Sequence, residues 1–133
     1  MSTSGIDGQL NATERRLLAA PLLAGAGREL RVLEVGTWLG GGSTLTFLRT
    51  LEQDGRGRLW GIEADRGIYD QMLANLRAAV PEAVHRFTPL FGFSQQVSSN
   101  RYSTTMATTW TTTLMTFRRI SFFSLFVLVL VLF

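Results

Sequence analysis

Hydrophobic and polar positions in the first two thirds of the chain alternate between short apolar runs and longer stripes at helical spacing. Val32–Val35 is a largely apolar, β-branched run beside glycines, and it predicts a strand buried on both faces. Residues 36–42 are then expected to form a loop, and Ser43 or Thr44 to cap a helix. One buried stripe of that helix is formed by Leu45, Leu48 and Leu51.

A second strand and a second helix repeat this order. The run 58–62 predicts a strand that finishes at residues 63–65, which read Glu-Ala-Asp. The helix that follows ends at Pro81, and its apolar positions share one face: Ile68, Met72, Leu73, Leu76 and Val80. A third strand is expected over 84–90, with His85 and Pro89 inside it. The order predicts an α/β fold with a Rossmann-like, doubly wound parallel sheet, truncated after about three strands.

The first 30 residues are expected to form a separate N-terminal helical segment. Asn11 followed by Glu14 matches a helix N-cap with its N3 carboxylate. The helix is expected to run through Leu17 and Ala20 and to be interrupted by Pro21. The first ten residues have no basic region and no apolar run, so no signal peptide is expected and a cytoplasmic location is the default prediction.

Composition changes near residue 97. All 10 carboxylates lie between Asp7 and Glu82, whereas the last 36 residues hold no acid and no glycine. Those residues are rich in serine and threonine at first, and they end in the apolar run Ile120–Phe133. We therefore divide the chain into three parts, which are the helical segment 1–30, the βαβαβ unit 31–97 and a tail of different composition, 98–133.

The residue types that are missing exclude several classes of protein. The chain has 13 basic residues, all arginine, and no cysteine. A disulfide-stapled module needs cysteines, and one histidine without cysteine makes a metal site unexpected. A nucleic-acid surface needs a dense basic stripe, which the scattered arginines do not form. We interpret His85, the single histidine, as a surface or packing residue rather than a catalytic one.

The loop after the first strand carries the candidate chemistry. Its glycines allow a sharp turn and a close approach to a ligand, and the helix N-terminus behind it favours an electron-rich group. A Walker loop would need a lysine where Gly42 stands. A dinucleotide fingerprint would need a glycine where Leu45 stands, so a nicotinamide-binding Rossmann enzyme is a weaker alternative.

The segment EVGTWLG, residues 34–40, resembles the first motif of class I S-adenosylmethionine-dependent methyltransferases, in the E-x-G-x-x-x-G-x-S form of small-molecule O-methyltransferases. Glu34 stands two residues before the first glycine, as in that family. The family's second landmark is an acid that ends the second strand. Glu63 matches it 27 residues after Gly36, with Asp65 as a nearby substitute. The resemblance covers residues 10–97.

The resemblance implies S-adenosyl-L-methionine as the cofactor. Glu63 would accept hydrogen bonds from both ribose hydroxyls, and Glu34 would hold the loop or the cofactor's ammonium group. Glycines would let the loop pass the methionyl part, and Ser94 follows the third strand, where the family contacts adenine. The expected cofactor-binding residues are Glu34, Gly36, Thr37, Trp38, Gly40, Gly41, Ser43, Glu63, Asp65 and Ser94.

Other interpretations of these residues stay open. The loop has three consecutive glycines before Ser43, one more than the common pattern, so the register of residues 41–43 against the ligand is not fixed. Glu63 or Asp65 would, in a purely structural interpretation, cap the second helix. Trp38 and Trp60 are interpreted as packing residues rather than as platforms for adenine.

The implied activity is methyl transfer to a small-molecule acceptor. A strand with its crossover takes about 30 residues, so a seven-stranded domain needs on the order of 200. The tail holds no carboxylate or histidine, and the family's metal-binding or basic residues therefore have no counterparts there. We expect cofactor binding if the half-domain folds, and we expect this chain alone not to transfer methyl groups. Its catalytic residues and oligomeric state are not assigned.

The tail has three competing explanations. A shifted reading frame or aberrant splice junction is ranked first, because the composition changes abruptly. A second is membrane association without enzymatic activity, although Ile120–Phe133 would span only about 21 Å as a helix against a hydrocarbon core of about 30 Å. A third is a strand-forming tail, since residues 122–133 are rich in β-formers and uncharged.

Overall fold

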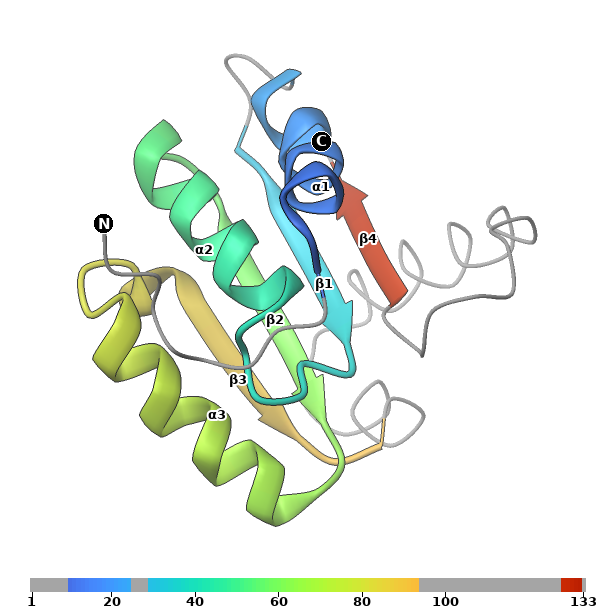
Figure 1. Cartoon of the computed structure of the whole chain (residues 1–133), viewed down its shortest axis with the longest axis vertical. Coiled ribbons are helices and arrows are strands. Elements are labelled where there is room, and N and C mark those ends of the chain that lie inside the picture. Colours follow the sequence, from blue (N-terminus) through green and yellow to red (C-terminus); the bar gives the residue numbers. More distant parts are fainter. Residues whose placement is uncertain (1–9, 25–28, 94–127, 133) are drawn as a thin grey trace.

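The computed structural model of the protein describes residues 10–24, 29–93 and 128–132. Strands and helices alternate along the chain up to the third strand, so the predicted βαβαβ unit is confirmed (Figure 1). The elements are α1 (Ala12–Ala24), β1 (Arg31–Val35), α2 (Ser43–Asp54), β2 (Arg58–Glu63), α3 (Arg66–Ala79), the 3-10 helix η1 (Val84–Arg86), β3 (Phe87–Phe91) and β4 (Leu128–Leu132).

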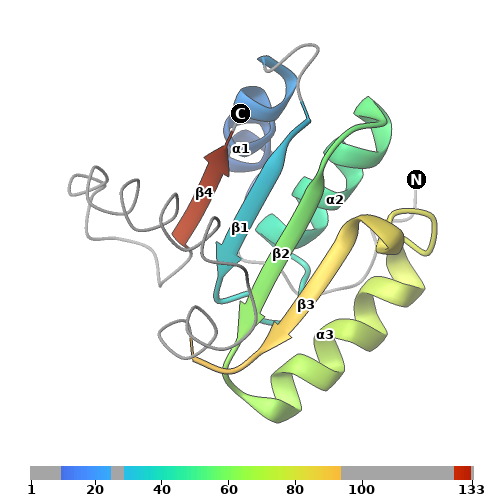
Figure 2. The same ribbon diagram turned by 180° about the vertical axis from the view of Figure 1, so that it is seen from behind.

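The four strands form one sheet in the order β3-β2-β1-β4. β1, β2 and β3 run parallel, with Val32 beside Leu59 and Leu59 beside Phe87. All three α-helices lie on the same face of the sheet, as the two opposite views show (Figures 1 and 2). Successive right-handed crossovers that proceed in one direction produce this arrangement. The α/β, Rossmann-like fold class is therefore confirmed.

β4 joins the sheet from the end of the chain. It runs antiparallel to β1, with Leu128 beside Val35 and Leu132 beside Arg31. For these five residues the strand-forming explanation of the tail agrees with the structure. The rest of the Ser/Thr-rich and apolar tail, 98–127, lies outside the described residues. In the ranges that are described, no helix has the length and apolar character needed to cross a membrane.

The core fills the space between the sheet and its helices. The predicted stripe of α2 is buried, and Leu48 and Leu51 are fully inaccessible to solvent. Met72 and Leu76 bring the corresponding face of α3 against the sheet, where Leu59 is also fully buried. Burial of these side chains supplies the main stabilisation, at roughly 25 cal/mol for each Å² of apolar surface removed from water.

The N-terminal helix starts as predicted but does not stop at its proline. Asn11 Oδ1 accepts hydrogen bonds from the amides of Thr13 and Glu14 at 2.9 and 3.0 Å, and Glu14 Oε2 accepts from the Asn11 amide at 2.8 Å. The expectation that Pro21 interrupts the helix is wrong, because α1 continues to Ala24. Leu22, one residue later, is fully buried in the core, and this packing holds the last turn in place.

The expectation of a strand over 84–90 is wrong at its start. β3 begins at Phe87, and His85 lies in η1 instead. After α3 the chain must turn back toward the start of β2, and it does so through tight turns in which the amide of Ala83 donates to Val80 and that of Arg86 to Ala83. The His85 side chain is 61% exposed, which confirms its interpretation as a surface residue.

Candidate cofactor site

The carboxyl ends of the three parallel strands bring the candidate residues to one edge of the sheet. The loop 36–42 follows β1, Glu63 ends β2, and Phe91 ends β3. Two backbone hydrogen bonds fasten these ends together, because the Gly36 amide donates to the Ile62 carbonyl and the Gly92 amide donates to the Glu63 carbonyl, each at 2.9 Å. In an open α/β sheet this edge is where ligands bind.

The loop after β1 takes backbone conformations that favour glycine. Gly36 and Gly40 have φ angles of 85° and 83°, and Trp38 between them has a φ of 50°. A Cβ atom at Gly40 would lie 3.1 to 3.2 Å from side-chain atoms of Leu76 and Met72, so the loop also lies closely against α3. The predicted need for glycine at these two positions is confirmed in conformational terms.

Glu34 holds the loop from inside the core. Its side chain is completely buried, and its carboxylate accepts hydrogen bonds from the hydroxyls of Ser43 and Thr44, the latter at 2.6 Å. Burial raises the pKa of Glu34 from 4.5 to about 7, although the two hydroxyl donors act in the opposite direction. Of the two roles expected for Glu34, the geometry therefore favours holding the loop, since both oxygens face hydroxyls in the interior.

The expectation that a hydroxyl side chain caps α2 is wrong, because the Ser43 and Thr44 hydroxyls donate to Glu34 instead. Ser43 or Thr44 was expected to cap the helix, but the N-cap residue is Gly42 and no side chain caps it. Ser43 and Thr44 instead lie in the first turn and donate to Glu34, nine and ten residues earlier in the chain. The local pattern of a hydroxyl before an apolar stripe does not distinguish a cap from a partner for a buried acid.

Glu63 links β2 to the loop. Its Oε2 accepts a hydrogen bond from the Trp38 amide at 3.0 Å, 25 residues earlier in the chain. Its Oε1 accepts from the amides of Ala64 and Asp65 at 2.9 and 3.0 Å. The two landmark positions of the sequence are thus joined through one half-buried carboxylate.

These three amides limit what else the carboxylate can bind. A carboxylate offers about four acceptor positions on its two oxygens. Oε1 of Glu63 already accepts two amide hydrogens, and Oε2 accepts one. Within the part of the chain that the structure describes, one position on Oε2 therefore stays open. This arrangement fits one hydroxyl donor from a ligand, whereas the sequence led us to expect two.

Two further side chains hold the loop, and sequence analysis missed both. Arg15 of α1 donates to the carbonyls of Gly41 and Gly42 at 3.0 and 3.3 Å, and Asn75 of α3 donates to the Leu39 carbonyl at 3.0 Å. Each joins segments 26 or more residues apart. No local pattern marks either residue, because each contact depends on how its helix packs against the loop.

Thr37 is a buried residue of the loop with an unusual polar atom. Its side chain is only 4% exposed, and its Oγ1 has no hydrogen-bond partner among the described residues. A Cβ atom added at Gly61 would come within 2.6 Å of the Thr37 methyl group, so that methyl lies on β2. A buried hydroxyl without a partner is costly, and a ligand group at this edge would lower that cost.

Aromatic side chains lie at the same edge. Trp38 is 52% exposed, so its interpretation as a packing residue is wrong, whereas Trp60 is half-buried on β2. The rings of Tyr69 and Phe91 meet edge to face with their centroids 5.6 Å apart. The Arg66 guanidinium lies 5.2 Å from the Phe91 centroid, within the range of a cation–π contact.

Two expected cofactor-binding residues remain, Asp65 and Ser94, and the structure describes only the first. Asp65 is the N-cap of α3, where its Oδ1 accepts from the Ile68 amide at 2.9 Å, so the capping interpretation is confirmed for Asp65. Ser94 lies outside the described residues. The residues that are described contain no group of three His, Cys, Asp or Glu side chains able to hold a metal ion.

The fold and the edge together define a class: a Rossmann-like α/β unit with its candidate residues at the carboxyl ends of three parallel strands. A solved structure with a similar fold is described as a putative O-methyltransferase from Klebsiella pneumoniae. The two chains superpose with a TM-score of 0.59 and share 27% sequence identity over 75% of this chain. This chain spans 43% of the Klebsiella protein.

The other two comparisons give no match. No protein-family model matches the sequence, and no curated protein matches it. The methyltransferase-like fold therefore rests on the solved structure and on the arrangement of the loop and Glu63.

Proposed function

We propose that the carboxyl edge of the sheet binds S-adenosylmethionine and that the chain is the cofactor-binding half of a small-molecule O-methyltransferase, which does not transfer methyl groups alone. One observation carries the proposal: the Glu63 carboxylate at the end of β2 binds the Trp38 amide in the glycine loop after β1. The likeness to the Klebsiella protein, over 75% of this chain, supports the same assignment.

The residues at the edge fit parts of this cofactor. The open acceptor position on Glu63 Oε2 suits one ribose hydroxyl, and the exposed Trp38 side chain and the Thr37 hydroxyl lie on the adjoining loop. The positive φ angle of Gly36 allows the sharp turn after β1, and the absence of a side chain at Gly40 lets the loop lie against α3. When bound, the cofactor supplies a methyl group on a positively charged sulfonium sulfur.

The interior residues of the site support the loop and do not face the ligand. The Ser43 hydroxyl donates to Glu34, and the Gly41 carbonyl accepts from Arg15. These two of the expected cofactor-binding residues therefore act as positioning residues in the proposal. The methyl acceptor is proposed to be a small molecule, and no residue is assigned to its chemistry.

Titration of the full chain with S-adenosylhomocysteine by calorimetry tests the proposal. Glu63→Gln removes the negative charge and is expected to weaken binding by about tenfold to a hundredfold, the value of one hydrogen bond to a charged acceptor. Glu82→Gln is the matched control, because Glu82 is an exposed acid remote from this edge in the chain and in the fold. The Glu82→Gln protein should bind S-adenosylhomocysteine with the affinity of the wild type.

Three outcomes would contradict the proposal. These are no binding by a folded sample, equal affinities of the Glu63→Gln and wild-type proteins, and binding of NAD in place of S-adenosylhomocysteine. Circular dichroism on each variant establishes that the protein titrated is folded. If Glu63→Gln does not fold, Glu63→Asp is titrated in its place. This variant keeps the negative charge on a shorter side chain, and it is expected to bind S-adenosylhomocysteine more weakly than the wild type does.

A further inference from the structure

The end of the glycine loop, residues 41–42, lies against the N-terminal helix. α1 packs against α2, which is the helix that begins directly after the loop (Figure 1). A Cβ atom added at Gly42 would lie 3.8 Å from Leu10 Cγ, so the residues that precede α1 are in contact with the loop. The N-terminal helical segment and the βαβαβ unit, which composition and periodicity separate, therefore meet at the candidate site.

The Arg15 guanidinium joins the two parts through four hydrogen bonds. Its Nη2 donates to the Gly41 carbonyl at 3.0 Å, and its Nη1 donates to the Gly42 carbonyl at 3.3 Å and to the Thr46 hydroxyl at 3.2 Å. Its Nε donates to the Leu10 carbonyl at 3.1 Å. A guanidinium presents its donors in a fixed planar fork, so acceptors on three segments define one position of this side chain.

The surroundings of Arg15 offer its charge little besides these carbonyls. Arg15 lies near the N-terminus of α1 and also reaches the N-terminus of α2, and both helix ends carry a partial positive charge that disfavours a cation. The ion pairs found among the described residues do not include Arg15, and its side chain is half-buried. Charge-assisted hydrogen bonds to the loop therefore hold this cation in place.

These bonds fix the peptide unit at the end of the loop. The Gly41 carbonyl and the Gly42 amide belong to one trans peptide unit, so they point in opposite directions. Three successive glycines, residues 40–42, have no side chains of their own to limit rotation of the backbone. With its carbonyl bound to Arg15, this peptide unit is held in one orientation. The order of the loop at this end therefore depends on Arg15.

We propose that Arg15 positions the glycine loop for the cofactor, so that the N-terminal helix controls the affinity of the site. This inference rests on the function proposed above. Glu63 and Asn75 hold the loop at Trp38 and Leu39, and neither bond reaches residues 41–42. Without Arg15, fewer molecules would have the loop in the conformation that binds the cofactor. The apparent affinity falls by the same factor as that fraction.

Hydrogen exchange on the full chain without ligand tests the positioning of the loop. The Leu45 and Thr46 amides donate to loop carbonyls at 3.0 and 3.3 Å, and both should exchange faster in Arg15→Gln than in the wild type. The Val80 amide, which is bonded within the end of α3, should be unchanged, because a general loss of stability would accelerate its exchange too. Leu22 is fully buried and keeps α1 packed against the core in this variant.

Titration with S-adenosylhomocysteine then tests the control of affinity. Arg15→Gln is expected to weaken binding about tenfold, the effect of one hydrogen bond from a charged donor. Arg15→Lys keeps the charge but donates from a single point, so its affinity should lie between those of Arg15→Gln and the wild type. Arg16→Gln is the matched control, because Arg16 is an exposed residue next along the same helix. It should bind as the wild type does.

The outcomes distinguish this inference from the proposed function. Absence of binding by the folded wild type contradicts the proposed function and this inference with it. If the wild type binds and both Arg15 variants bind equally well, only the role of Arg15 is overturned. An equal loss of affinity in Arg16→Gln would assign the effect to net charge, and unchanged exchange at Leu45 and Thr46 would show that Arg15 does not order the loop. If Arg15→Gln does not fold, Arg15→Lys is compared with the wild type in its place.

Discussion

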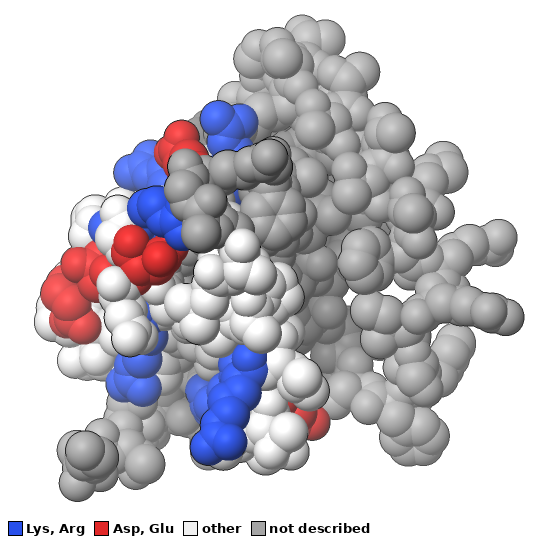
Figure 3. Space-filling view, turned by 90° about the horizontal axis from the view of Figure 1, so that it is seen from above, with Lys and Arg blue, Asp and Glu red and all other residues white. Residues whose placement is uncertain are grey.

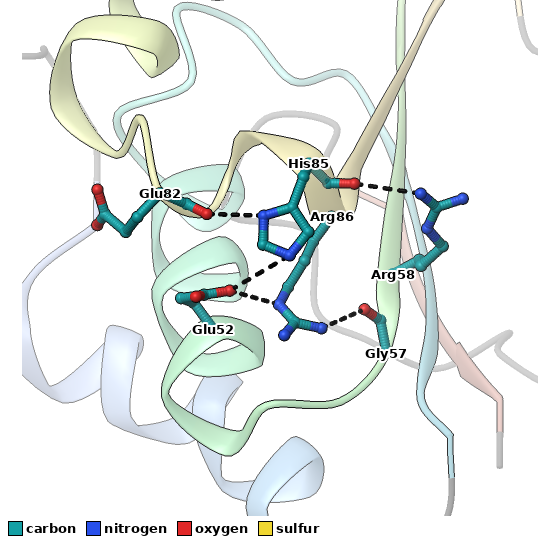
Figure 4. Close-up of polar contacts among 6 residues, drawn as sticks. All are labelled: Glu52, Gly57, Arg58, Glu82, His85 and Arg86. Atoms are coloured by element: carbon teal, nitrogen blue, oxygen red, sulfur yellow. Dashed lines mark hydrogen bonds and ion pairs between the residues drawn. The ribbon is translucent and has the colours of Figure 1, made fainter.

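The two ends of the parallel sheet use their charged side chains in opposite ways. At the amino end, Glu52 of α2 pairs with Arg86 of η1 at 2.5 Å, and the His85 ring lies 3.7 Å from the same carboxylate (Figure 4). Asp54 pairs with Arg56 at 2.6 Å. At the carboxyl end, the carboxylates bind backbone amides or hydroxyls, and neither Glu34 nor Glu63 has a cationic partner among the described residues.

This difference shows which end is suited to a ligand. A shallow hollow does lie at the amino end, and the view onto that end shows arginines and acids interspersed (Figure 3). Arg56 pairs there with Asp54, and Arg86 pairs with Glu52. Arg58 donates to the His85 carbonyl, so these side chains fasten turns together. Glu63 at the other end keeps an acceptor position beside an exposed tryptophan and a strained loop. The hollow is lined by Glu29, Gly55, Arg56, Gly57, Arg58, His85 and Arg86.

The buried acid beneath the loop gives the largest expected effect. Because burial raises the pKa of Glu34 to about 7, the folded protein retains a proton that the unfolded chain releases near 4.5. The resulting stability is fully present below pH 4.5 and is lost as the pH rises to about 7. The free energy of unfolding is expected to fall by roughly 3 kcal/mol over this range, at about 1.4 kcal/mol for each pKa unit.

Glu34→Gln isolates this contribution because it is uncharged at every pH and nearly isosteric. Urea unfolding of both proteins at pH 4.5 and pH 8 measures the difference. The variant should match the wild type within about 1 kcal/mol at pH 4.5 and exceed it in stability at pH 8. A constant difference between the two proteins would mean that Glu34 has the same pKa in the folded and unfolded protein, and would contradict the expected shift.

Alanine substitutions at two glycines near the amino end of the sheet separate the cost of backbone strain from the cost of a steric clash. Gly55 and Gly57 have φ angles of 72° and 87°. A Cβ atom at Gly57 would lie 2.5 Å from the Leu30 carbonyl oxygen, whereas one at Gly55 meets nothing within 4 Å. Gly55→Ala should therefore cost about 1 kcal/mol from strain alone, and Gly57→Ala at least about 2 kcal/mol.

Thermal unfolding measures the stability of both variants, and titration with S-adenosylhomocysteine measures their affinity for the ligand. If the two ends of the sheet act independently, both variants bind the ligand as the wild type does at temperatures where they are folded. Equal destabilisation by the two substitutions would show that Leu30 moves away without cost. Weakened binding would show that the turn before β2 influences Glu63 at the other end of the strand.

Local patterns predicted the strands, the main helices and the glycine loop, because period and turn chemistry depend on neighbouring residues. Glu34 and Glu63 were found through the resemblance to the methyltransferase motifs, in which one acid stands two residues before the first glycine and the other ends the second strand. The partners of the loop were not found, since Arg15 and Asn75 reach it across 26 and 36 residues, and such contacts depend on how helices pack. The tail's apolar run indicated strand formation but gave no partner or direction for β4.

The ion pair at the amino end gives the smallest expected effect. Arg86 is 17% exposed and Glu52 is 33% exposed, so solvent screens their attraction only in part. Arg86 also donates to the Gly57 carbonyl at 3.3 Å, a bond that Glu52→Gln leaves in place. The amide oxygen can still accept from the guanidinium, so the variant should lose about 0.5 to 1 kcal/mol of stability.

This variant also gives a direct comparison with Glu63→Gln, because the same chemical change is made at opposite ends of neighbouring elements. Glu52→Gln is expected to alter urea unfolding slightly and S-adenosylhomocysteine binding not at all. Glu63→Gln is expected to alter binding at least tenfold. If both variants weakened binding equally, the ligand would not distinguish the two ends, and the charge of the whole molecule rather than the Glu63–Trp38 contact would govern binding.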